Sequence, residues 1–170
     1  VAYARSKQSE KAVTHFKRVP AGGPYFDQAQ AQAAYLLKTE GQSDDGLKLL
    51  EKPVVDKKAG PKMLTMYASL LDDRGETKKA LQILESAILS YPKDTELHFY
   101  FGTLHDKVGD KKKVVEVIRS IIQMDPMHLQ GINYLAYTFA EQGENLEEAE
   151  QLARKAVKID PQDGYIMDTL

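Results

Sequence analysis

The sequence predicts an all-α protein built from repeated pairs of antiparallel helices. Apolar residues recur at intervals of three or four, which gathers them on one stripe of a helix. Glycines recur 34 residues apart, at Gly41, Gly75, Gly109 and Gly143. Glycine readily adopts the left-handed backbone angles that end a helix, so each of these residues marks a turn. Turns at a constant separation indicate a repeat architecture.

The clearest repeat runs from Leu129 to Pro161. Gly143 divides it into two amphipathic helices, with Asn145 as the expected N-cap of the second. Pro161 ends the second helix because proline cannot continue it. The apolar stripes of the two helices contain Ile132, Leu135, Ala136, Phe139, Ala149, Leu152, Ala153, Ala156 and Val157.

This unit resembles a tetratricopeptide repeat, a family with a period of about 34 residues. Two further positions keep this period until the last step, which is 35 residues because Asn145 is inserted: the short residue near the start of the second helix and the closing position. They read Ala12, Gly46, Ala80, Val114, Ala149 and Pro24, Lys58, Pro92, Pro126, Pro161. The resemblance covers essentially the whole chain, and it implies a right-handed α-solenoid of stacked helix pairs.

The period predicts a single array with units at about 1–26 (partial), 27–60, 61–94, 95–128, 129–163 and 164–170 (partial). Both ends fall inside a unit, so we expect the sequence to be a fragment of a longer protein. The expected helices before the clearest repeat cover 9–19, 27–39, 43–52, 61–73, 77–90, 97–108 and 111–124, and a last one opens at Asp163.

Several helix ends follow from single residues. We expect Ser9, Thr77 and Asp110 to act as caps, and Asp94 or Thr95 to open the helix over 97–108. Pro53 lies inside a second helix, where its missing N–H and its ring destabilise the helix by about 3 kcal/mol. We therefore expect that helix to stop near Lys52 and residues 53–60 to be irregular.

Composition excludes several classes of function. The 23 basic and 25 acidic residues leave a net charge of −2, too small to favour nucleic acid or an anionic membrane. The chain has no cysteine, and no apolar run approaches the ~20 residues that span a bilayer. His98 and His105 are seven residues apart, about 10 Å along a helix, too far to hold a metal as a pair. We interpret them as packing residues, and we expect no catalytic residue, metal or cofactor.

In this family the first helices line a concave groove, and positions 2, 5, 9 and 12 of each unit face it. The resemblance therefore implies a wall of Gln28, Ala31, Tyr35, Lys38, Lys62, Thr65, Ser69, Asp72, Glu96, Phe99, Thr103, Asp106, Gln130, Asn133, Tyr137, Ala140, Tyr165 and Asp168. The candidate partner-binding residues are Tyr35, Lys62, Thr65, Phe99, Thr103, Asn133, Tyr137 and Tyr165. Exposed aromatic side chains are the usual anchors of protein recognition. The alternative for each aromatic residue is that it packs against the next first helix.

The family also includes a carboxylate-clamp subtype, which grips an acidic chain terminus. Lys62 and Asn133 fit such a clamp, but Asp72, Glu96 and Asp106 would repel the terminus, so this interpretation is disfavoured.

These features predict a non-catalytic scaffold that holds a partner peptide or helix in the concave groove. Two alternatives remain: a self-association module, and a recruiting arm of an enzyme or protease complex whose active domain lies outside this sequence. The clearest repeat also resembles the C-terminal repeats of bacterial tetratricopeptide lipoproteins and periplasmic adaptors. That resemblance implies the bacterial periplasm or cell envelope, with the cytoplasm as the alternative.

Overall fold

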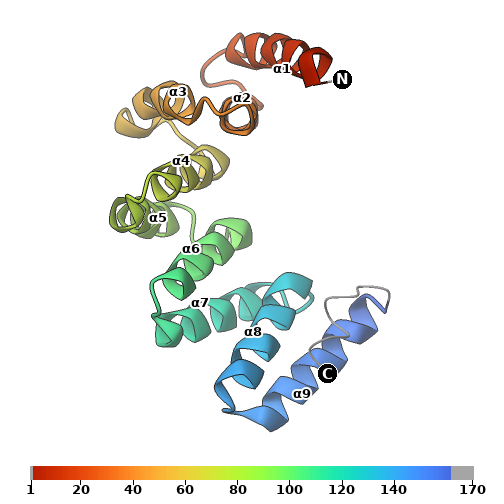
Figure 1. Ribbon diagram of the computed structural model, residues 1–170. Coiled ribbons are helices and arrows are strands. Elements are labelled where there is room, and N and C mark those ends of the chain that lie inside the picture. Colours follow the sequence, from red (N-terminus) through yellow and green to blue (C-terminus); the bar gives the residue numbers. More distant parts are fainter. Residues whose placement is uncertain (1, 162–170) are drawn as a thin grey trace. The chain divides into compact units, whose positions relative to one another are not determined.

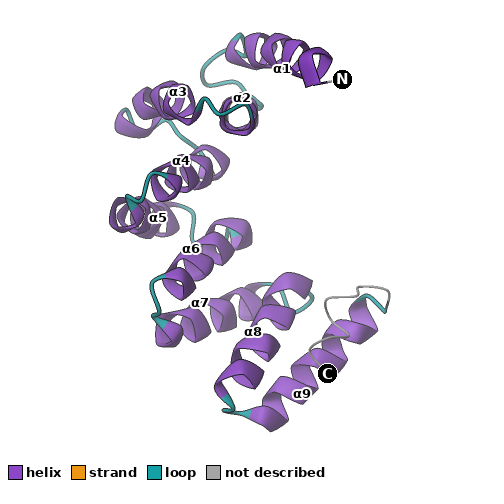
Figure 2. Cartoon of the chain, viewed as in Figure 1, coloured by secondary structure: helices purple, strands orange, loops and turns teal. Residues whose placement is uncertain are grey.

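The structure, a computed structural model, describes residues 2–161, with side chains from residue 8 onward. Tyr165, Asp168 and the helix predicted to open at Asp163 lie outside the described residues. Within the described part all regular structure is helical (Figure 1, Figure 2), which confirms the predicted all-α class. The helices are α1 (Ala2–Lys17), α2 (Phe26–Thr39), α3 (Ser43–Val55), α4 (Pro61–Asp73), α5 (Thr77–Ser90), α6 (Thr95–Lys107), α7 (Lys111–Met124), α8 (Leu129–Gln142) and α9 (Leu146–Ile159).

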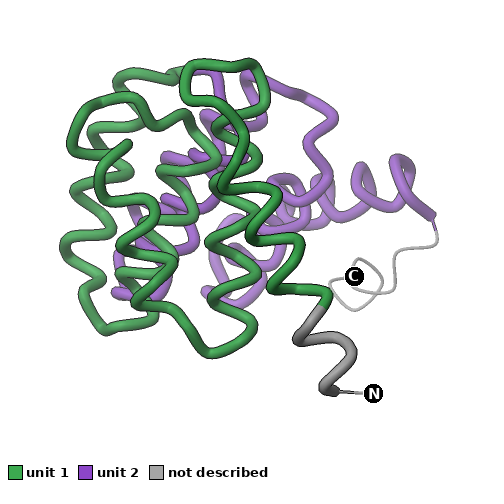
Figure 3. The backbone as a smooth tube through the Cα atoms, turned by 90° about the horizontal axis from the view of Figure 1, so that it is seen from above, with its two compact units in different colours: residues 1–92 green, residues 93–170 purple. Residues whose placement is uncertain are grey.

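The chain divides into two compact units, Val1–Pro92 and Lys93–Leu170 (Figure 3). Unit 1 contains α1 to α5 and unit 2 contains α6 to α9. In unit 1, α2 pairs with α3 and α4 with α5, and the first helices α2 and α4 also contact each other. In unit 2, α6 pairs with α7 and α8 with α9. The division into six repeat units within one array stays a prediction.

The periodic glycines form the turns as predicted. Each of them lies between the two helices of a pair and has a positive φ: 78° at Gly41, 79° at Gly75, 81° at Gly109 and 66° at Gly143. A side chain at such angles is strained. Glycine at these four positions is what lets the second helix turn back onto the first.

The start predicted for α1 was wrong. We expected a helix from Ser9, but α1 is continuous from Ala2 to Lys17. The reason lies at position 7, one period before Gly41, where the sequence has Lys7. Without a glycine that adopts the left-handed conformation easily, the helix does not break there.

The end predicted for α3 was also wrong, because the helix passes through Pro53 and ends at Val55. Pro53 removes a single hydrogen bond, that of its own missing N–H, and the helix continues for only two residues beyond it. Its carbonyl oxygen accepts from the backbone N–H of Lys58 at 2.8 Å and of Ala59 at 3.1 Å. These bonds close the helix end and form the turn that leads to α4.

The caps predicted at Asp94 and Asp110 are confirmed, whereas those predicted at Ser9, which lies inside α1, and at Thr77 are not. Asp94 accepts from the N–H of Leu97 at 2.8 Å, and Asp110 accepts from that of Lys113 at 3.1 Å. Thr77 is already the first residue of α5, and its hydroxyl instead donates to the Asp72 carboxylate at 2.7 Å.

The N-caps of unit 2's last helix pair differ from the prediction in detail. Asn145 occupies the N-cap position of α9, with φ 50° and no side-chain cap bond. His128 caps α8, because its Nδ1 accepts from the N–H of Gly131 at 3.0 Å. Sequence reasoning found no role for this histidine.

The core consists of alanines where helices approach closely and larger aliphatic residues between them. The fully buried residues include Ala34, Ala68, Ala136, Leu84 and Ile118.

The two histidines of α6 pack as predicted. His98 is buried, with Nδ1 2.7 Å from the carbonyl oxygen of Asp94. The His105 ring meets Phe101 edge to face, with 4.5 Å between centroids.

Candidate functional site

In unit 1 the candidate surface lies on the first helices α2 and α4. Tyr35 projects from α2 with half of its surface exposed. On α4, Lys62 is exposed and Thr65 is half-buried. Lys38 connects the two helices, because its ammonium donates to Ser69 Oγ at 2.8 Å and lies 2.7 Å from Asp73 Oδ2. Lys38 therefore links α2 to α4.

Asp27 aligns the same two helices at their other end. Its carboxylate accepts from the backbone N–H groups of Lys62 and Met63, both at 3.0 Å. These groups belong to the first turn of α4, which has no cap from its own N-cap residue, Gly60. A negative charge at a helix N-terminus is favourable, so a side chain of α2 caps α4.

In unit 2 the candidate surface lies on α6 and α8, and its aromatic residues differ in exposure. The Phe99 ring lies 5.6 Å from the Tyr134 ring, edge to face, and 5.9 Å from the His128 ring. Phe99 therefore packs against α8, the alternative considered for the groove aromatics. Tyr137 is 54% exposed.

The two polar candidates of unit 2 are less exposed than Tyr137. The Thr103 hydroxyl donates to the carbonyl oxygen of Tyr100 at 2.8 Å, within α6. Asn133 is half-buried on α8. The structure thus brings Thr103, Asn133 and Tyr137 onto first helices of one unit, with Tyr137 the most exposed of the three.

A polar network behind this surface connects α6, α7 and α8. The Tyr134 hydroxyl donates to Asp106 Oδ2 at 2.8 Å. The Lys111 ammonium lies 2.8 Å from Asp106 Oδ1 and 2.9 Å from Glu141 Oε2. The charge of the half-buried Asp106 is thus balanced by that of Lys111. Sequence reasoning missed Tyr134. It lies one helical turn before Tyr137 and Thr138, and this spacing does not predict a hydrogen bond to α6.

These contacts change the proton affinity of each group. Burial raises the pKa of Asp106, but hydrogen bonds from Lys111 and Tyr134 outweigh it and lower the pKa below its ordinary value. Burial and the bond to Asp106 raise the pKa of Tyr134. The bonds to Asp106 and Glu141 raise the pKa of Lys111. At neutral pH Asp106 and Lys111 are therefore charged, while Tyr134 keeps the proton that it donates to Asp106.

Acid should therefore weaken unit 2 through Asp106. A carboxyl group whose pKa is lower in the folded state stabilises above its unfolded pKa, about 3.9 for Asp, and loses this contribution as the pH falls. We expect Asp106→Asn to flatten the loss of thermal stability between about pH 4 and pH 2. Circular dichroism melts measure this. Glu96→Gln, at an exposed carboxylate of the same helix, is the control and should leave the slope unchanged.

Neither a metal centre nor a membrane span emerges from the described residues. No group of three or more histidine, aspartate or glutamate side chains gathers there in a way that could hold a metal ion. Of the described helices, none combines the length and apolar character that crossing a bilayer requires.

Antiparallel helix pairs with alanines at their contacts and a left-handed glycine in each turn define the α-solenoid class of protein-interaction scaffolds. Within that class, residues 135–163 match the family model of the tetratricopeptide repeat. This match and the architecture confirm the resemblance: the chain carries this repeat and has the tetratricopeptide-repeat fold.

Solved structures support the same fold over nearly the whole chain. YrrB, a TPR protein with an unusual peptide-binding site, is 19% identical with a TM-score of 0.68, covering 97% of this chain and 84% of YrrB. MamA is 19% identical with a TM-score of 0.72, covering 93% and 92%. A thermophilic TPR protein of Thermus thermophilus is 18% identical with a TM-score of 0.72, covering 98% and 90%. A sequence search of curated proteins finds no match.

Proposed function

We propose that the first-helix faces bind extended segments of a protein partner, anchored by Tyr35 in unit 1 and Tyr137 in unit 2. One observation carries this proposal: the two tyrosines occupy the same position of the repeat, three periods apart, and are 50% and 54% exposed. The other groove aromatic described, Phe99, packs against α8 instead. A tyrosine offers a rigid apolar ring and a polar tip, a combination enriched at binding hot spots.

The surroundings of both tyrosines suit an extended backbone. Gln28 lies two turns before Tyr35 on α2, and Thr65 occupies a groove-facing position of the repeat on α4. On α8, Gln130 and Asn133 precede Tyr137. Such side chains can donate to and accept from peptide groups. The tetratricopeptide-repeat fold supports a protein-interaction scaffold, and YrrB, with the same fold, has a peptide-binding site. Binding by this face, without catalysis, is our proposal for this chain.

The test uses peptides selected for binding to the unaltered chain by display, with affinities measured by calorimetry. Tyr35→Ala and Tyr137→Ala together should weaken binding at least about tenfold, since hot-spot aromatics contribute about 2 kcal/mol or more. Helical content should not change, because both side chains lie at the surface.

The matched control is Tyr25→Ala, because Tyr25 is an aromatic residue that is 72% exposed and precedes α2. It should leave the affinity unchanged. Peptides that bind the double variant as tightly as the unaltered chain, or an equal loss with Tyr25→Ala, would remove the first-helix faces from the proposal.

Self-association is the second candidate function, supported by two exposed apolar residues. Val55 on α3 is 71% exposed and Leu89 on α5, one period later, is 81% exposed. Exposed apolar side chains in register can meet a second copy. Sedimentation velocity over a dilution series separates this candidate from a monomeric scaffold. The recruiting-arm role and the bacterial envelope location stay proposals from the family resemblance.

A further inference from the structure

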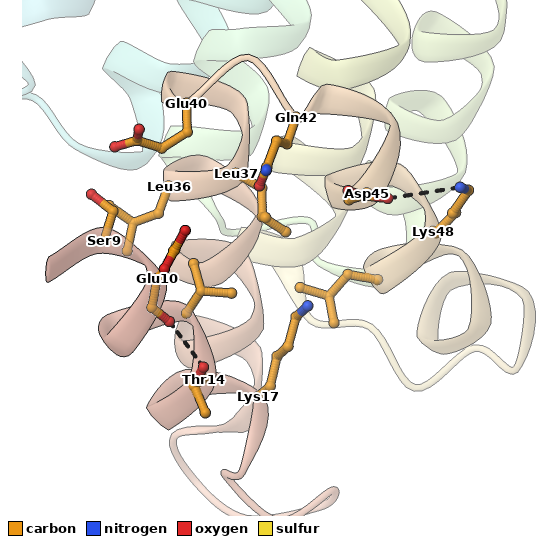
Figure 4. A pocket seen from close by; sticks show the side chains of 12 residues that line it. Ser9, Glu10, Thr14, Lys17, Leu36, Leu37, Glu40, Gln42, Asp45 and Lys48 are labelled. Atoms are coloured by element: carbon orange, nitrogen blue, oxygen red, sulfur yellow. Dashed lines mark hydrogen bonds and ion pairs between the residues drawn. The ribbon is translucent and has the colours of Figure 1, made fainter. Parts of the chain in front are cut away.

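Unit 1 has two clefts at equivalent positions of the repeat. The first cleft lies between α1 and α3 over the end of α2, with a volume of about 720 Å³ (Figure 4). The second cleft lies between α3 and α5 over the end of α4, with a volume of about 750 Å³. Because the repeat places corresponding residues in both, the second cleft shows what the first one lacks.

The charges of the second cleft are matched within the chain. Arg74 reaches two acids, with Nη1 3.4 Å from Asp44 Oδ1 and Nε 3.4 Å from Glu76 Oε1. Lys79 also pairs with Glu76. A guanidinium thus lies between the carboxylates at the end of the first helix, and these acids need no outside partner.

In the first cleft the position that corresponds to Arg74 holds no cation. The position of Arg74 is occupied by Glu40, that of Asp44 by Glu10, and that of Glu76 by Gln42. Both Glu10 and Glu40 are exposed and line the cleft (Figure 4). Neither carboxylate has an ion-pair partner among the side chains of residues 8–161.

The two lysines that line the first cleft do not replace Arg74. Lys48 lies 3.7 Å from Asp45, so its charge is already shared with an acid. Lys17 follows Glu10 by two helical turns, about 10 Å along α1. Of the described side chains, none therefore forms an ion pair with Glu10 or Glu40 at this end of the cleft.

Beneath these charges the cleft has an apolar floor. Val13 and Leu37 are buried, and Leu36 and Leu49 pack against them while remaining partly exposed. A partner side chain entering the cleft can bury apolar surface on this floor and place a positive group between the two glutamates. The long aliphatic stem of arginine or lysine fits such a site.

We propose that the first cleft binds a basic side chain, flanked by apolar residues, in a segment of a partner protein. The incoming cation takes the place that Arg74 occupies in the second cleft. Charge complementarity favours this occupant over an acidic or a purely apolar segment. The cleft includes neither Tyr35 nor Thr65, so this site is separate from the proposed first-helix surface.

The probe is the peptide acetyl-Ala-Leu-Arg-Leu-Ala-amide, with citrulline in place of arginine as a neutral control of the same shape. We expect the arginine peptide to shift amide NMR signals of residues 9–17, 36–42 and 45–49 of the full chain. The citrulline peptide should bind at least about tenfold more weakly, and added salt should weaken the arginine peptide. Equal binding of the two peptides, or shifts confined to other residues, would contradict the proposal.

Two exchanged variants sharpen the test. Glu40→Arg gives the first cleft the residue of the second, so it should abolish the shifts by pairing with Glu10. Arg74→Glu, the matched variant, should create a second binding site with new shifts between residues 44 and 86. Both changes are at exposed side chains, so helical content should be preserved, as circular dichroism checks.

The remaining outcomes are also decisive. Binding that survives Glu40→Arg would overturn the assignment. Shifts in the cleft that grow with protein concentration, without peptide, would identify a second copy as the occupant and overturn it as well. Tyr35→Ala with Tyr137→Ala should leave peptide binding here unchanged, so failure of the first-helix proposal and failure of this one are distinguishable.

Discussion

Replacement of Gly60 by alanine is expected to destabilise unit 1 by about 3 kcal/mol, a large effect for one methyl group. Gly60 has φ −83° and ψ −178°, which any residue adopts, so backbone strain is not the cause. A Cβ atom there would instead lie 2.7 Å from both carboxylate oxygens of Asp27. The methyl group would push Asp27 away from the first turn of α4, whose N–H groups it caps.

A double-mutant cycle tests this explanation through urea unfolding. Asp27→Ala alone should reduce the free energy of unfolding by about 1–2 kcal/mol, because two N–H groups lose their partner. In that background Gly60→Ala should have little further effect, since the carboxylate is gone. If the two losses simply add, the overlap with Asp27 is not what excludes a side chain at position 60.

Replacement of Ile118 by alanine is expected to destabilise unit 2 by about 3–4 kcal/mol. Ile118 is fully buried on α7, so the truncation leaves a cavity that its rigid neighbours fill only in part. The cavity would open next to Gly102 on α6, because a Cβ at Gly102 would lie 3.3 Å from the Ile118 Cδ1. Thermal and urea unfolding both measure the loss.

Gly102→Ala provides the matching compensation. The corresponding positions of other first helices are Ala34, Ala68 and Ala136, all fully buried. In the Ile118→Ala background the new methyl group should recover about 1–2 kcal/mol, by filling space and by favouring the helix. In the unaltered chain the gain in helix propensity is offset by crowding, so stability should change by less than about 1 kcal/mol. Equal effects in both backgrounds would show that the cavity does not reach Gly102.

Local sequence signals predicted most of the helices within one or two residues. Asp94 and Asp110 cap their helices as expected, and four periodic glycines form the turns. The two errors have local explanations as well. Lys7 replaces the glycine that would have divided α1, and Pro53 lies too near the end of α3 to stop it. A helix breaker acts according to its distance from the helix end, which the repeat register alone did not reveal.

The candidate site was predicted less completely than the fold. The register placed Tyr35, Phe99 and Tyr137 on first helices, but their exposure depends on residues distant in sequence. Phe99 is half-buried, and its ring contacts those of Tyr134 on α8 and His128, the N-cap of α8. Likewise Asp106, which looked like a repelling charge in a groove, forms an ion pair with Lys111 and accepts a hydrogen bond from Tyr134. No pattern within α6 contains that information.

The sequence by itself determined the helix pairs, their turns and their period, because these depend on apolar spacing and on glycine's freedom at positive φ. Only the tertiary structure decided which polar and aromatic side chains remain available to a partner. Availability depends on whether a neighbouring helix supplies a ring or an opposite charge within a few ångströms. Arg74 finds Asp44 across its cleft, and Glu40, one period earlier, finds no cation among the described residues.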